Sequence, residues 1–146
     1  MNIAGFEFPE ELHYLVPHDT WARLDADGLV RVGITSLGVH MAGELYMCRP
    51  QPMGREVEAG RSIAVVELAK SIVSVKSPLS GTVAEVNAAL EDHPELVYRD
   101  CYRGGWLARL RPADWARDRQ GLVTGGAAIA AAMRRQLWLH GLTPEP

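Results

Sequence analysis

The sequence lacks the features that would assign it to several common classes of protein. No apolar run approaches the roughly 20 residues of a membrane-spanning helix, and the first residues, MNIAGFEFPEEL, have neither the basic region nor the apolar stretch of a secretory signal. Lys and Arg form no cluster beyond Arg134 and Arg135, and the formal net charge of the 146 residues is −3. Binding to nucleic acid or to an anionic membrane is therefore not indicated. We expect a cytoplasmic protein whose partners are proteins or small molecules.

The residues that carry most enzyme chemistry are also too scattered to form a site. No serine lies in a G-x-S-x-G elbow, and GREVEAGRS has neither the glycine spacing nor the lysine of a phosphate-binding loop. The five histidines stand singly, without the i, i+4 pairing of a metal site. Cys48 and Cys101 are far apart and form no zinc or C-x-x-C pattern, so we expect free thiols. The sequence predicts no catalytic residues and no metal site.

Short apolar segments separated by turn residues are abundant. WARL, LVRVGIT, LYMCR, REVEAG, SIAVVEL, IVSVKSP, GTVAEVN and GGWLARLR are strand candidates, and SLGVHMAGEL is a short helical or irregular connection. A chain of this length fits a single domain that needs no disulfides. Many short strands at near-regular spacing predict a mainly β fold, either a sandwich or a barrel.

The C-terminal segment has a helical pattern instead. Pro112 suits the first position of a helix, Asp114 is placed favourably for the helix dipole, and Gly121 can end the helix. Farther on, Gly141 is a C-cap candidate, and one apolar stripe recurs every four residues at Ile129, Met133 and Leu137. We predict a β domain over residues 1–111 and a helical extension over residues 112–146 that packs on it through this stripe.

Lys70 stands between two β-prone segments, SIAVVEL and SIVSV. A lysine that carries a covalent group must be exposed at a sharp turn and held by rigid strands, and these segments provide such strands. Gly81 follows at a neighbouring turn, where we expect a positive φ. A solvated surface lysine is the plainer interpretation of the same pattern.

A resemblance to a known family favours the first interpretation. VGITSLGVHMAGEL, VVELAKSIVSVKSPLSGTVAEVNAALEDHPELV and DCYRGGWLARLRP resemble the H-protein family of lipoyl carriers, best known from the glycine cleavage system, from about Leu12 to Pro112. The family's attachment pattern has a glutamate three residues before the lysine and a glycine eleven after it. Glu67, Lys70 and Gly81 match this pattern.

The resemblance implies a flattened barrel-sandwich hybrid of two antiparallel sheets, with Lys70 at a hairpin tip and amide-linked to lipoic acid. Glu67 and Gly81 would then serve recognition by a lipoate-attaching enzyme, and the protein would be a carrier rather than an enzyme. Biotin is the nearest competitor, but a biotinyl lysine is normally flanked by methionines. Lys70 lies between Ala69 and Ser71.

Three positions around the expected docking place of the arm differ from glycine-cleavage H proteins. Thr20 replaces an acidic residue, Met41 a histidine and Ser74 an aspartate. A cleft without these groups would hold a cationic amine poorly. VKSP, at residues 75–78, and the C-terminal extension are similar instead to lipoate-binding carriers of a heterodisulfide-reductase-like sulfur-oxidising system.

We therefore favour such a sulfur-oxidising complex as the client of a monomeric carrier. The alternative clients are the glycine cleavage components, with dihydrolipoamide dehydrogenase as a further partner. A scaffold that is never modified is the third interpretation.

Overall fold

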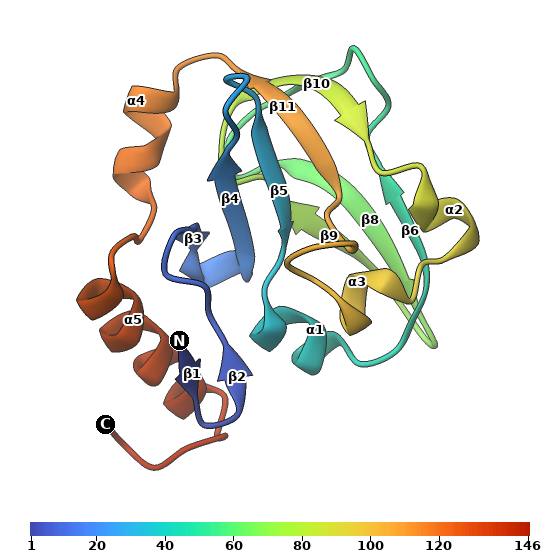
Figure 1. Ribbon diagram of the computed structural model, residues 1–146. Helices are drawn as coiled ribbons and strands as arrows, with labels where there is room; N and C mark the ends of the chain where they lie inside the picture. Colours follow the sequence, from blue (N-terminus) through green and yellow to red (C-terminus); the bar gives the residue numbers. More distant parts are fainter.

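The computed structural model describes all 146 residues, which form two antiparallel sheets with helices at their edges (Figure 1). The strands are β1 (Asn2–Ile3), β2 (Phe6–Glu7), β3 (His13–Leu15), β4 (Thr20–Leu24), β5 (Val30–Ile34), β6 (Leu45–Pro50), β7 (Glu56–Val57), β8 (Ser62–Leu68), β9 (Ile72–Lys76), β10 (Gly81–Val86) and β11 (Ala108–Pro112). The α-helices are α1 (Ser36–Ala42), α2 (Ala89–Asp92), α3 (Leu96–Arg99), α4 (Trp115–Asp118) and α5 (Gly126–Leu139), and the 3-10 helices are η1 (Val16–His18) and η2 (Arg119–Gly121).

The larger sheet has six strands in the order β3-β4-β5-β11-β10-β7, and the smaller has three in the order β6-β8-β9. A two-stranded ribbon of β1 and β2 precedes them. Side chains alternate between the two faces of each strand, and those on the facing sides of the two sheets form the main core. Val66 and Val75 of the smaller sheet and Val32, Val83 and Leu110 of the larger one are all buried there. This arrangement confirms the predicted fold class.

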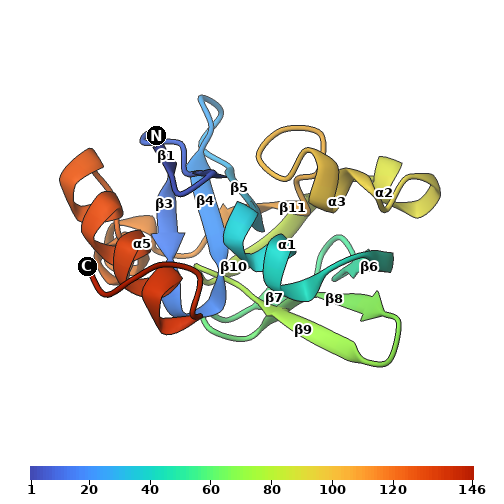
Figure 2. The ribbon, with the colours of Figure 1, turned by 90° about the horizontal axis from the view of Figure 1, so that it is seen from below.

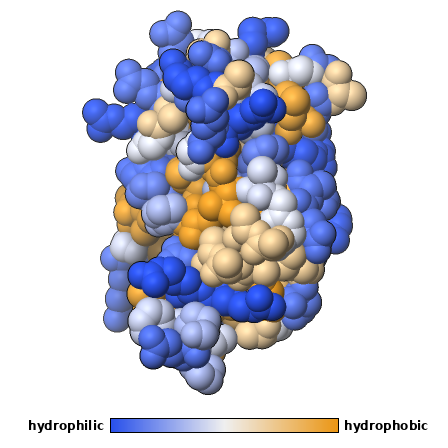
Figure 3. All heavy atoms as spheres, turned by 90° about the vertical axis from the view of Figure 1, so that its left-hand side faces the viewer, coloured by the Kyte–Doolittle hydropathy of each residue, from blue (hydrophilic) through white to orange (hydrophobic).

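Helix α5 covers one side of the larger sheet (Figure 2). The predicted stripe is confirmed, since Ile129, Met133 and Leu137 are buried in a second core with ten buried members. The remaining members are Phe8, Leu12, Tyr14, Trp21, Leu37, Cys101 and Tyr102. Helix α5 ends at Leu139 with His140 as its C-cap, one residue before the expected Gly141. Gly141 follows with a φ of +72°, and the N–H groups of Gly141 and Leu142 donate to carbonyls of the last turn at 2.9 Å. Apolar residues also gather on the outer side of this region (Figure 3).

Two predictions about strand and helix ends are wrong. Pro112 does not begin a helix but is the last residue of β11, a strand end where its missing N–H costs little. Helix α4 begins at Trp115, after Asp114, whose carboxylate accepts a hydrogen bond from the Arg117 N–H at 3.1 Å. The strand expected from residue 104 begins only at Ala108, because residues 104 and 105 belong to a turn.

None of the helices has the length and apolar character that a membrane crossing requires.

Candidate functional site

Lys70 lies in the turn that joins β8 to β9, at the free end of the smaller sheet (Figure 1). The Leu68 N–H donates to the Ser71 carbonyl at 2.8 Å and closes this turn. Ala69, Lys70 and Ser71 are all exposed, and Lys70 takes part in none of the ion pairs. The amine is therefore accessible and uncommitted.

The turn is held on a rigid support. Strand β8 is paired on both sides, with β6 at Leu45↔Leu68 and with β9 at Glu67↔Ile72, so the pairing continues almost to Lys70. Farther from the turn, the hairpin is anchored by side chains buried between the two sheets. Lys70 is thus held on paired strands rather than on a long loop.

Glu67 lies beside the turn, on the outer face of the smaller sheet. Its neighbours across the two ladders are Met47 on β6 and Ile72 on β9. The side chain is half-buried, and its carboxylate forms no ion pair. Glu67 is therefore a free acceptor within reach of any protein that approaches Lys70.

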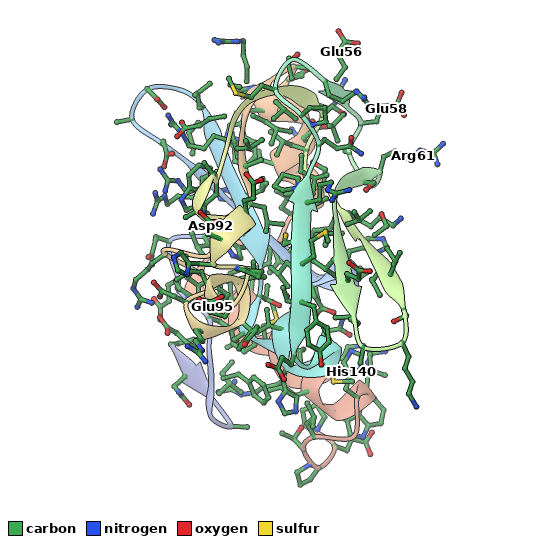
Figure 4. All side chains as sticks on the ribbon, turned by 90° about the vertical axis from the view of Figure 1, so that its right-hand side faces the viewer. Glu56, Glu58, Arg61, Asp92, Glu95 and His140 are labelled. Carbon is green, nitrogen blue, oxygen red and sulfur yellow. The ribbon has the colours of Figure 1, made fainter.

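Gly81 is not near Lys70. It begins β10, is buried, and pairs with Val57 and Pro112 in the larger sheet, beyond the end of β9 that lies away from the turn. Strand β9 has five residues and separates the two positions by roughly 17 Å. Figure 4 shows Glu56 and Glu58, which flank Val57, at the end of the molecule opposite the β8–β9 turn.

The expected positive φ of Gly81 is also wrong, because its φ is not among the positive values of the chain. The reason for glycine is close packing instead. A Cβ at this position would meet the carbonyl oxygen of Arg111 on the neighbouring strand. Gly81 therefore supports the fold and does not contact the Lys70 amine.

The three positions that depart from the glycine-cleavage pattern have different surroundings. Thr20 is only 1% exposed and its hydroxyl has no partner, whereas Met41 is 47% exposed at the end of α1. Ser74 accepts a hydrogen bond from the Lys76 ammonium at 3.1 Å, which places a positive charge where an aspartate was expected. Of these positions only Met41 is openly available to a ligand.

Asp19, next to Thr20, is a carboxylate that the sequence reasoning missed. It is half-buried and has a φ of +56°. Burial raises the pKa of Asp19, while His140 and His18 act to lower it. An acidic residue was expected just before Trp21, and the resemblance placed that position at Thr20. Asp19, one residue earlier, is the acidic residue that lies nearest to it in the sequence.

A shallow groove lies on the outer face of the smaller sheet, beside the turn. Its volume is about 290 Å³, and it is lined by Met47, Arg49, Val65, Glu67 and Ile72. A larger cleft of about 520 Å³ lies elsewhere, between the β1–β2 turn, α1 and the segment from Tyr98 to Arg103. None of the turn residues lines either hollow, but the groove includes Glu67 and Ile72, which flank the turn.

The two cysteines are free, as expected, and both are buried. Burial raises the pKa of Cys48 and of Cys101 to about 12, so neither is a thiolate near neutral pH.

Comparison with known proteins places these features in a family. The family described as "Glycine cleavage H-protein" matches residues 12–135. The glycine cleavage system H protein 2 of Aquifex aeolicus is 38% identical over 125 residues, which cover 86% of this chain and 78% of that protein. The glycine cleavage system H protein of Halorhodospira halophila is 43% identical over 108 residues, covering 74% of this chain and 82% of that protein.

A crystal structure of a glycine cleavage system H protein from Mycobacterium marinum is similar, with a TM-score of 0.67 and 35% identity. The similarity covers 73% of this chain and 87% of that one. The family match continues past Pro112, where the resemblance was expected to end, and includes most of α5. The C-terminal helix therefore does not set this chain apart from the family.

Proposed function

Because this chain belongs to the glycine cleavage H-protein family, we propose that Lys70 carries a lipoyl group in amide linkage and that the protein shuttles an intermediate between enzymes of a multicomponent system. Proteins of this family are lipoyl carriers and not catalysts themselves. The observation that carries the proposal is the place of Lys70, exposed and unpaired in a tight turn at the end of a paired hairpin.

The residues around Lys70 fit such a group. Lys70 and Lys76 are the only lysines of the chain, and Lys76 is half-buried and bonded to Ser74. The lipoyl group would supply redox-active sulfurs at the end of a long tether. The strands on both sides of the turn would hold the point at which the lipoyl group is attached. A tether keeps the group at its far end at an effective concentration of order mM near a docked partner.

The glycine cleavage system is the client best supported by the relatives, since the proteins from Aquifex aeolicus, Halorhodospira halophila and Mycobacterium marinum are named as its H proteins. We therefore propose the glycine cleavage components as the partners. The preference for a heterodisulfide-reductase-like complex finds no support among these relatives. The C-terminal extension, which favoured it, lies mostly within the family match.

One observation keeps a sulfur-carrying role as a second candidate. The Lys76 ammonium beside Ser74 adds positive charge along the strand that leaves the Lys70 turn, with no carboxylate paired to it. A cation there disfavours a protonated amine on the arm and favours an anionic sulfur group.

Two measurements test these proposals in turn. First, the intact mass of protein made in lipoate-supplied cells should show the addition of one lipoyl group, located at Lys70 by peptide mapping. An unmodified Lys70 would support the scaffold interpretation, and a biotin mass would contradict the lipoyl assignment. Second, the lipoylated protein should accept the aminomethyl group from glycine decarboxylase. A lipoylated protein that fails this reaction would favour the sulfur-carrying candidate.

A further inference from the structure

The cleft of about 520 Å³ lies apart from the residues of the proposed carrier site. One of its walls is the turn between β1 and β2, which precedes residue 12, the first residue of the family match. The other walls are α1 and the segment from Tyr98 to Arg103, and α1 lies between the two-stranded ribbon and α3 (Figure 1). None of Glu67, Lys70 and Gly81 lines this cleft. Its chemistry is therefore separate from that of the carrier site, and one wall lies outside the family match.

Hydrogen bonds around one buried side chain hold the walls of the cleft together. The Tyr102 hydroxyl donates to the Glu7 carbonyl at 2.7 Å and accepts from the Ser36 N–H at 2.9 Å. The Ser36 hydroxyl donates to the same Glu7 carbonyl at 2.7 Å. Glu7 belongs to β2, and Ser36 is the first residue of α1. The three walls are thus joined at one point, so the cleft is a preformed hollow, as most sites for small molecules are.

Aromatic rings are concentrated in this cleft. Its lining includes Phe6, His40, Tyr98 and Tyr102, whereas four further hollows of 290–590 Å³ contain one ring between them. Phe6 and His40 meet edge to face, with 5.1 Å between their ring centroids and 84° between their planes. Phe6 and Tyr98 are only half-buried, so part of each ring is open to the cleft. A flat ligand can pack against these rings.

The charged side chains of the cleft leave one arginine uncommitted. Arg103 pairs with Glu7 at 3.2 Å and with Asp100 at 3.6 Å, so both carboxylates already have a cationic partner. Arg99 forms no ion pair, and its guanidinium carbon lies 5.9 Å from the centroid of the Tyr98 ring. A guanidinium presents a planar fork of N–H donors that matches a phosphate. Arg99 is therefore the group that remains for an anion, next to an aromatic ring.

We propose that this cleft binds a nucleoside phosphate, with the base against Phe6 and Tyr98 and the phosphate on Arg99. The rings match a flat heterocycle, and the guanidinium fork matches the phosphate. The volume of about 520 Å³ is within the range of sites that bury small ligands. Inorganic phosphate or a nucleoside without phosphate would use only half of the site. The inference goes beyond the carrier function and does not depend on whether Lys70 is modified.

Isothermal titration calorimetry of the whole chain with adenosine monophosphate tests the assignment. Adenosine and inorganic phosphate are titrated separately, because each supplies only one half of the ligand. Adenosine monophosphate should bind with a dissociation constant about tenfold or more below that of either. Arg99→Gln should raise this constant about tenfold or more. Arg111→Gln is the matched control and should change it by no more than about twofold. Arg111 is also exposed and unpaired, but it lines a hollow of about 590 Å³ without an aromatic ring.

A second variant isolates the contribution of the rings. Phe6→Leu should weaken the binding of adenosine monophosphate about tenfold and leave the binding of inorganic phosphate unchanged. Its thermal midpoint is recorded, because Phe6 also packs against the second core. If this variant unfolds, Arg99→Gln still decides, since that side chain is exposed. Amide chemical shifts locate the bound nucleotide, and the largest changes should include Gly5 and Gly43, which line the cleft.

The inference is overturned if adenosine monophosphate does not bind the wild type at millimolar concentration, or if inorganic phosphate binds as tightly as the nucleotide. It is also overturned if Arg99→Gln leaves binding unchanged or if the two arginine variants weaken it equally, because the binding would then follow overall charge. Shift changes that gather around Arg111 or Lys70, instead of around the cleft, would place the nucleotide elsewhere and contradict the assignment.

Discussion

The main-chain oxygen of Arg111 lies where a side chain on Gly81 would begin. Gly81 is buried in β10 between β11 and β7, and both neighbouring strands are paired with it. Strands β10 and β11 can lie this close together at Gly81 only because the residue has no Cβ. Since the atoms that the Cβ would meet are all backbone atoms of β11, a small shift of one flexible side chain cannot relieve the clash.

We therefore predict that Gly81→Ala lowers the free energy of unfolding by about 1–3 kcal/mol, the usual cost of overpacking. Urea unfolding of the purified protein measures it. Gly121→Ala is the matched control, because a Cβ on Gly121 meets nothing within 4 Å and its φ is not positive. Lipoylation of Gly81→Ala should fall only in proportion to its folded fraction. A stable variant that is poorly lipoylated would instead indicate direct recognition of Gly81.

The second prediction concerns Lys70 itself. Lys70→Arg should abolish lipoyl attachment while changing the free energy of unfolding by no more than about 0.5 kcal/mol, because the side chain is exposed and supports no contact of the fold. Intact mass and thermal unfolding measure the two effects. Lys76→Arg is the control and should be lipoylated like the wild type. Attachment to Lys76 in the Lys70→Arg protein would contradict the assignment of a single acceptor.

Alternation and helical spacing predicted most strands and the buried stripe of α5, because each signal reports directly which side faces the core. The same signals could not reveal the exposed groove on the outer face of the smaller sheet. Ile72 and Val73 are neighbours in a strand and therefore point to opposite sides, but because both are apolar the sequence does not indicate which of them faces the core or that both are exposed. Gly81 shows a related limit, because a glycine indicates either a positive φ or close packing, and only the neighbouring strand decides between them.

The third prediction tests the division into residues 1–111 and 112–146. Leu137 is fully buried against the second core, so Leu137→Ala should lower the free energy of unfolding by about 2–5 kcal/mol. Arg134→Ala, on the exposed side of the same helix, should cost less than about 0.5 kcal/mol. Urea unfolding compares them.

The isolated 1–111 segment should fail to fold cooperatively. It would lose three members of the second core, and also the hydrogen bonds at 2.8 and 2.9 Å that join Tyr14 to Val123. A 1–111 protein with a sharp unfolding transition near that of the whole chain would show that the helical segment is a separate addition.

The fourth prediction uses the two buried thiols. Because burial raises the pKa of Cys48 and Cys101 to about 12, neither should react appreciably with a maleimide or an aromatic disulfide at pH 8 in the folded protein. Both should react in denaturant. Thiols titrated in the folded, reduced holoprotein would then belong to the lipoyl group alone, which gives a direct count of loaded arms. Rapid native labelling of Lys70→Arg, which has no arm, would contradict this.

The same shift makes stability depend on pH in a defined direction. Each thiol has its ordinary pKa of 9.0 when unfolded and about 12 when folded, so above pH 9 the unfolded chain loses protons that the folded protein retains. The free energy of unfolding should therefore be unaffected by these groups below pH 9 and should fall above it, by at most about 1.4 kcal/mol per pH unit for each thiol. Burial also raises the pKa of Tyr14 and Tyr102 above the ordinary 10.0, so the window from pH 9 to 10 isolates the cysteines. Replacing both cysteines with alanine should flatten the decline in that window, and an unchanged slope would show that the thiols are not its source.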